Sequence, residues 1–183
     1  MKRLVFLALA IMLAAPAFTL AQAAPVQPPK PGPEHQALAG LVGNWTSEGE
    51  CSATPMTPAE KWSAKLKSEW FPGKFAVVRH LESKGTVTGE SVGLEVLTYD
   101  SQAKAYTWYG VDSFGWNGMA KGSIAKDVLT VTWPATVKGK AYKVRGIVKG
   151  LGSDKLLWTM EYSADGRTWK AACTATDVRA KAN

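Results

Sequence analysis

The sequence predicts an all-β fold, an antiparallel up-and-down barrel of about 8–10 strands behind a short N-terminal helix. Aromatic and β-branched residues recur in short runs that Gly-containing turns separate, a composition typical of sheet. Short turns between consecutive runs favour antiparallel neighbours. A sheet with this many strands must curl, split or close, and closure removes its exposed edges.

The chain opens with the features of a secretory signal peptide. Lys2 and Arg3 form a basic head, and the apolar run behind them ends in an A-x-A cleavage pattern at residues 21–23. Pro16 interrupts that run, which argues against the alternative, a membrane-spanning anchor. We therefore expect residues 1–23 to be cleaved near Ala23 and the mature protein to be periplasmic or secreted.

A tether and a short helix are expected next. Residues 24–33 hold five prolines, which predicts an extended segment without packed structure. Residues 34–41 predict a helix, because Pro33 and an early acidic residue are favourable at a helix start. Gly43 is expected to end the helix, and residues 34–183 are expected to fold as one domain.

Beyond residue 44, apolar and polar side chains alternate with period two, as in strands with one wet face. We expect nine or ten strands, with turns at Pro72-Gly73, Asn117-Gly118 and Asp165-Gly166. Both faces of residues 106–114 carry aromatic residues, so the sequence does not decide which face points inward. After the first strand, the expected runs are 62–70, 75–83, 90–99, 106–114, 119–124, 128–133, 141–148, 155–163 and 168–178.

The two cysteines, Cys51 and Cys173, lie in the first and last expected strands. In an oxidising compartment an even number of cysteines predicts a disulfide, and two cysteines allow one pairing. That bond would place the first strand beside the last and close the barrel. Two independent buried thiols are the alternative.

A second pair of residues fits the same register. Antiparallel partners have a constant sum of residue numbers, and Trp45 with Arg179 gives the same sum as Cys51 with Cys173. The two pairs are separated by an even number of residues, so both lie on one face of the sheet. We therefore expect the Arg179 guanidinium to stack on Trp45, a contact that stabilises by about 0.5–2 kcal/mol.

These residues carry a resemblance. Gly43-x-Trp45 after a short helix, with the late Arg179 over the Trp, resembles the lipocalin and fatty-acid-binding-protein superfamily. The stretch from Tyr99-Asp100 to Val111-Asp112-Ser113 is similar to a family of bacterial exported proteins catalogued as a domain of unknown function and thought to be lipocalin-like. The resemblance implies a lipocalin-like barrel with a habit of binding small ligands, and it names no substrate.

Strand alternation predicts which side chains line the barrel. A two-residue turn at Pro72-Gly73 would pair Leu66 with Arg79 and turn both inward, and the last hairpin would pair Trp158 with Cys173. Small inward residues leave room for one small ligand. The expected ligand-binding residues are Ser68, Trp70, Arg79, Trp108, Tyr142, Trp158 and Tyr162, and the expected structural residues are Trp45 and Arg179.

An inward Arg79 needs a partner for its charge. The partner is either an internal acid or the carboxylate of a bound ligand, held bidentately. Our hypothesis is the second, in which case Arg79→Leu should abolish fatty-acid binding. The internal pair stays open as the alternative.

The predicted function is therefore binding of a small apolar or amphipathic molecule by an exported barrel. The alternative is a structural or stress-related envelope interaction domain with a filled barrel and no ligand. An enzyme is the least favoured class, because no catalytic constellation appears and Asp100, Asp112, Asp154 and Asp165 fall at expected turns.

Other partners are not expected. The net charge is +7, but the lysines are scattered and form no basic stripe of the kind that binds nucleic acid. No cofactor and no metal site are expected, because both cysteines are assigned to a disulfide and His35 and His80 are isolated in the sequence. Haem ligation by His80, as in some related barrels, is the alternative. The sequence predicts no oligomeric state.

Overall fold

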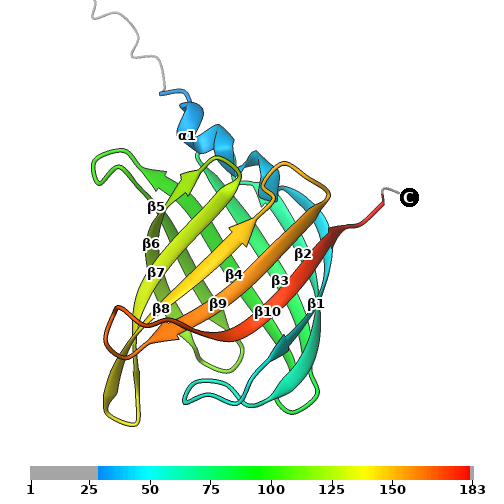
Figure 1. Ribbon diagram of the computed structural model, residues 1–183. Helices are drawn as coiled ribbons and strands as arrows, with labels where there is room; N and C mark the ends of the chain where they lie inside the picture. The colour runs from blue at the N-terminus through cyan, green and yellow to red at the C-terminus, as the bar shows by residue number, and fades with distance from the viewer. Residues whose placement is uncertain (1–28, 182–183) are drawn as a thin grey trace, which may run out of the picture.

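The computed structural model describes residues 29–181, and the expected leader and the first part of the tether lie outside them. The described residues form a closed antiparallel barrel in which each strand pairs with its neighbours in the chain and β1 pairs with β10 (Figure 1). The predicted all-β up-and-down barrel is confirmed. Its elements are α1 (Pro33–Gln36), the 3-10 helix η1 (Ala37–Leu41), β1 (Gly43–Cys51), β2 (Glu60–Trp70), β3 (Ala76–Gly85), β4 (Gly89–Asp100), β5 (Ala105–Asp112), β6 (Asn117–Ala125), β7 (Val128–Val137), β8 (Lys140–Lys149), β9 (Lys155–Ser163) and β10 (Lys170–Arg179).

The helical segment covers the end of the barrel at which β1 begins (Figure 1). One α-helical turn that starts at Pro33 passes into η1, and Leu38 and Leu41 of η1 are fully buried in the core. Gly43 follows with φ +133°, a conformation that L side chains rarely adopt, and a Cβ there would meet the Arg179 guanidinium. No helix in the described residues is long and apolar enough to cross a membrane.

The seam between β1 and β10 has the register expected from the sequence. Trp45 lies opposite Arg179 and Cys51 lies opposite Cys173, and the two cysteines form a disulfide. Chain segments 122 residues apart in sequence are thus joined covalently at the end of the barrel away from the helices.

The predicted register of the hairpin between β2 and β3 is wrong. Arg79 lies opposite Ser68 and not opposite Leu66. The turn is longer than two residues, because the Phe71 N–H bonds the carbonyl of Ala76 at 2.8 Å. The shift amounts to two positions, so each side chain keeps its expected face.

The last hairpin also differs from the prediction. Trp158 lies opposite Ala175 and not opposite Cys173, because the loop adds one position to the register and a β-bulge between Ala171 and Cys173 adds another. The Asp165 carboxylate accepts two backbone N–H bonds of the turn, at 2.7 and 2.8 Å, and fixes a longer loop. Trp158 still points into the barrel.

The turn expected at Asn117-Gly118 is wrong, since both residues already belong to β6. The chain reverses over residues 113–116, where Oδ1 of Asp112 accepts the N–H groups of Phe114 and Trp116 at 2.9 and 3.0 Å. This shorter β5 has a defined inner face. Its inward side chains follow the pairing with β4 and are Tyr106, Trp108 and Asp112, with Gly110 between them.

The apolar core is concentrated at the helical end of the barrel. There the inward side chains of the strands pack against η1, and the Trp45 indole N–H donates to the carbonyl of Leu41 at 3.0 Å. This end is sealed by burial of apolar surface. Its most buried members are Leu38, Leu41, Trp45, Val77, Leu129, Val131 and Leu156.

Candidate functional site

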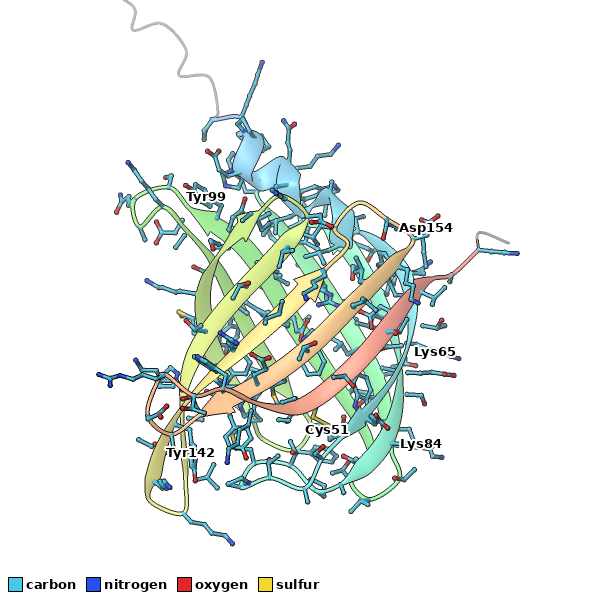
Figure 2. The ribbon with its side chains drawn as sticks, viewed as in Figure 1. Cys51, Lys65, Lys84, Tyr99, Tyr142 and Asp154 are labelled. Atoms are coloured by element: carbon cyan, nitrogen blue, oxygen red, sulfur yellow. A yellow bond between two sulfur atoms is a disulfide. The ribbon has the colours of Figure 1, made fainter. Side chains whose placement is uncertain are left out.

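The candidate site is the lumen of the barrel, in which Tyr142, Val144 and Cys173 are buried at the end away from the helices but three other inward side chains are more accessible. Near η1 the inward Trp45 is 2% exposed, whereas Trp62, Trp158 and Met160 also point inward and are only partly buried. Solvent therefore reaches these side chains from inside the barrel. Figure 2 shows Cys51 and Tyr142 at this open end and Asp154 at the helical end.

Inside the barrel, Ser68, Arg79 and Glu95 lie side by side on β2, β3 and β4. Nη1 of Arg79 pairs with Oε2 of Glu95 at 2.9 Å, and Nε donates to the Ser68 hydroxyl at 3.3 Å. The guanidinium carbon lies 6.0 Å from the ring centroid of Trp108. Arg79 thus has an internal acid as its partner, which is the alternative that the sequence left open.

Burial in the barrel raises the pKa of Glu95 above its ordinary value. The Arg79 guanidinium opposes this shift, and the carboxylate of Asp177 adds to it. Desolvation disfavours the charged form of the carboxyl group more than one guanidinium favours it. Glu95 is therefore easier to protonate than an exposed glutamate.

A second acid, Asp177 of β10, faces the same lumen and is 6% exposed. Its Oδ1 accepts a hydrogen bond from the Ser47 hydroxyl of β1 at 2.6 Å. In the described part of the chain, no basic side chain lies within 4.0 Å of this carboxylate. Of the two lumen carboxylates, Glu95 is thus paired with Arg79, whereas Asp177 has no ion-pair partner among the described residues.

Sequence reasoning missed both Glu95 and Asp177. The signal for Asp177 was present, because it precedes the inward Arg179 by two residues on the same strand and so shares its face. Glu95 could be found in the same way only after β3 and β4 were aligned.

Two indoles form an aromatic wall below Asp177, toward the open end. Trp62 and Trp158 meet edge to face with ring centroids 6.1 Å apart. Trp62 lies across Gly49, where a Cβ would come within 2.6 Å of its ring, and Trp158 lies opposite Ala175. Small residues on β1 and β10 therefore make room for large ones on β2 and β9.

The predicted ligand-binding residues fall into separate groups along the lumen. Ser68, Arg79 and Trp108 lie together in its middle, as described above. Tyr142 and Tyr162 form an edge-to-face pair at the open end, with centroids 6.0 Å apart. Trp70 lies opposite Val77, toward the helical end, and packs against the core, as Trp108 and Trp158 also do.

A hollow of about 690 Å³ is lined mainly by β1 to β4, and one of about 840 Å³ lies at the seam and is lined by β1, β2, β9 and β10 with the end of β3. Their linings include outward-facing side chains such as Lys65 and Lys84 as well as inward ones, so part of each volume lies outside the barrel wall. The inward lining of the larger hollow consists of Gly49, Trp62, Gly85, Trp158 and Ala175.

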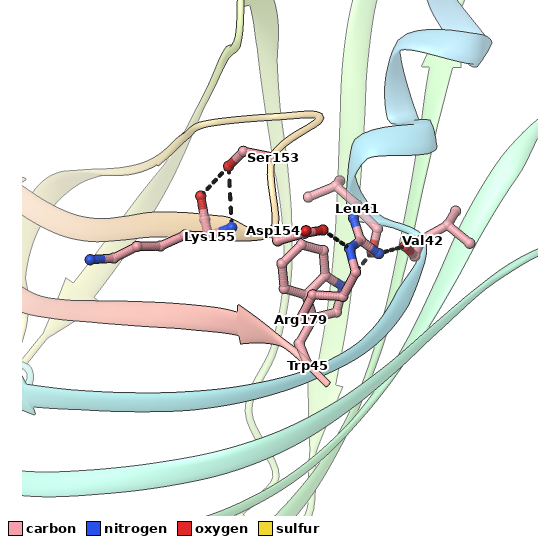
Figure 3. A network of polar contacts seen from close by, with 7 residues as sticks. All are labelled: Leu41, Val42, Trp45, Ser153, Asp154, Lys155 and Arg179. Atoms are coloured by element: carbon pink, nitrogen blue, oxygen red, sulfur yellow. Dashed lines mark hydrogen bonds and ion pairs between the residues drawn. The ribbon is translucent and has the colours of Figure 1, made fainter. Parts of the chain in front are cut away.

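Arg179 belongs to the closure of the helical end and not to the open lumen (Figure 3). Its guanidinium carbon lies 4.1 Å from the Trp45 ring centroid. Nε donates to Oδ1 of Asp154 at 2.8 Å, and Nη1 donates to the carbonyl of Val42 at 2.6 Å. One side chain therefore joins β1, the end of η1 and the loop before β9.

Neither histidine faces the lumen: His80 is exposed on the outer face of β3, and His35 packs against Phe75 and Tyr99 at the helical end. Across residues 29–181, no three His, Cys, Asp or Glu side chains are close enough together to hold a metal ion.

Comparison with known proteins supports the fold. No curated protein matches the sequence. The crystal structure of Rv2717c from M. tuberculosis matches with a TM-score of 0.57 at 16% identity, over 83% of this chain and 100% of the other. The S-type phycobiliprotein lyase CPES from Guillardia theta matches with a TM-score of 0.51 at 12% identity, over 84% of this chain and 100% of the other. At these identities the likeness concerns the barrel alone. Residues 30–179 match the family described as "Protein of unknown function (DUF1579)", and the chain belongs to that family.

Proposed function

We propose that the chain is an exported lipocalin-like barrel that binds a small apolar or amphipathic molecule in its lumen. The observation that carries the proposal is the partial exposure of inward-facing Trp62, Trp158 and Met160. Large apolar side chains accessible from inside a barrel are the walls that small-molecule sites use, together with a few polar groups. The proposed contacts are Ser68, Trp70, Arg79, Trp108, Tyr142, Trp158 and Tyr162.

The proposed export draws support from the disulfide. Cys51 and Cys173 are bonded, and the described residues hold no free cysteine. Disulfides form and persist in oxidising compartments. This bond and the signal-peptide pattern at residues 1–23 support the proposed periplasmic or secreted location.

The test is ligand binding with a matched pair of variants. Mass spectrometry of an extract from the natively purified protein, and quenching of tryptophan fluorescence by a panel of fatty acids, amines and alcohols, report whether ligands bind. Ser91→Phe puts a ring into the lumen, and Val92→Phe puts the same ring on the outer surface. We expect Ser91→Phe to weaken binding at least about tenfold and Val92→Phe to leave it within about twofold.

Two outcomes contradict the proposal. If no compound of the panel binds and the native extract is empty, the barrel is filled, and the structural or envelope-stress role takes its place. If both phenylalanine variants weaken binding equally, the ligand binds outside the lumen.

A further inference from the structure

Next to the sealed helical end, the lumen contains the acidic side chain of Asp177. Asp177 is 6% exposed, and its carboxylate accepts one hydrogen bond, from the Ser47 hydroxyl. No basic side chain of the described residues pairs with it. Burying a charge without a countercharge is costly, so a carboxylate in this state favours a cation beside it.

The second carboxylate oxygen is the one available to a ligand. Oδ2 of Asp177 receives no hydrogen bond from the described residues, and no fully buried side-chain oxygen or nitrogen among them lacks a partner. Oδ2 is therefore accessible from the lumen. It is an acceptor that a ligand with N–H donors would satisfy.

Arg79 of the lumen is not free to bind the carboxylate of a ligand. Arg79 is bound by Glu95 and Ser68, so a ligand carboxylate would have to displace Glu95 to reach full pairing. It would also approach a lumen that already contains two acids for one guanidinium. The electrostatics therefore oppose an anionic head and favour a cationic one.

The walls next to Asp177 suit the remainder of such a ligand. Along β10 and β1 toward the open end, the next inward residues are Ala175 and Gly49, and the Trp158 and Trp62 rings flank them. An ammonium group near indole faces gains cation–π attraction, and an alkyl chain gains apolar contact. A metal ion is the weaker candidate, because the described residues bring no third ligand to the two acids.

We infer that the lumen binds a small amphipathic amine, with its ammonium group on Asp177 and its apolar part between Trp62 and Trp158. This inference rests on the proposed function, because it requires an occupied lumen. It replaces the ligand carboxylate on Arg79 by a ligand cation on Asp177.

The test compares three ligands of equal chain length below their micelle concentrations. Dodecylamine, dodecanoate and dodecanol are titrated into the full-length mature protein by calorimetry and tryptophan fluorescence. We expect dodecylamine to bind at least about tenfold tighter than the other two. Without Lys2 and Arg3 of the expected leader, the net charge of +7 becomes +5, so unspecific electrostatic attraction would favour dodecanoate and cannot produce this order.

Asp177→Asn then removes the charge with little change of shape. We expect this substitution to lower the affinity for dodecylamine at least about tenfold and to change the affinity for dodecanol by no more than about twofold. Glu48→Gln, which removes an exposed acid on the outer face of β1, is the matched control and should change neither affinity.

The outcomes separate this inference from the proposed function. Equal or tighter binding of dodecanoate or dodecanol by the wild-type protein overturns the amine assignment and leaves lumen binding intact. Binding of none of the three overturns both. The order of the three affinities in the wild-type protein tests the amine assignment even if Asp177→Asn does not fold.

Discussion

The Cys51–Cys173 disulfide should contribute several kcal/mol to the stability of the barrel. The bond closes a loop of 122 residues, nearly all of the strand-forming chain. Loop-closure entropy for that length corresponds to about 5 kcal/mol at 25 °C. Because denatured chains keep some structure, we expect a loss of about 3–5 kcal/mol in Cys51→Ser/Cys173→Ser.

Urea titration followed by tryptophan fluorescence measures this loss. Replacing both cysteines avoids a lone thiol, and the wild-type protein unfolded under reducing conditions should reproduce the double variant. The slope of the transition should increase, because the denatured chain without the cross-link exposes more surface. A loss below about 1 kcal/mol would refute the reasoning that the bond acts by restricting the unfolded chain.

Three further variants test the structure. Arg179→Lys keeps the charge but loses the planar stack on Trp45 and the forked hydrogen bonds, so the free energy of unfolding should fall by about 1–2 kcal/mol in urea titration. Gly122→Ala places a Cβ against the backbone carbonyl of Thr130, and thermal unfolding should show a loss of at least about 2 kcal/mol, whereas an unchanged midpoint would contradict the packing. Because the pKa of Glu95 is raised, the folded protein binds a proton at this carboxyl group more tightly than the unfolded chain does. The protonated group therefore stabilises the fold at pH values below its unfolded pKa of 4.5. This contribution is lost as the pH rises through the pKa of the folded state. The stability difference between wild type and Glu95→Gln, measured by urea titration at several pH values from 4.5 to 8, should therefore shift against the wild type as pH rises, and a difference that is constant or moves the other way would contradict the assignment.

Sequence alone was sufficient for the seam that closes the barrel. Period-two alternation fixes the face of each residue, and the shared register of Cys51 with Cys173 and Trp45 with Arg179 specifies how β1 meets β10. These are properties of strand geometry that any antiparallel pair must obey.

The turns were harder to predict, because their lengths depend on side-chain bonds that no periodicity reveals. Asp112 and Asp165 each hold a loop through backbone N–H bonds, which moved one turn to residues 113–116 and lengthened another. The longer loop at Asp165 moved the pairing of β9 with β10 by one position, and the β-bulge moved it by a second, so the residues beyond the bulge keep their expected face.

The polar content of the lumen was the part that sequence reasoning missed. Glu95 meets Arg79 only through the β3–β4 pairing, and Asp177 meets Ser47 only through the barrel seam. Contacts of this kind depend on several registers at once. Predicting the fold correctly was therefore enough to identify the aromatic residues that line the lumen, but it was not enough to identify its acidic residues.

Crystallography with a bromine-labelled alkyl amphiphile tests the central claim, an occupied lumen, most directly. We expect anomalous bromine density inside the barrel, beside Trp62 and Trp158 and toward the open end. Bromine density confined to the outer surface, or no bound amphiphile at saturating concentration, would contradict it.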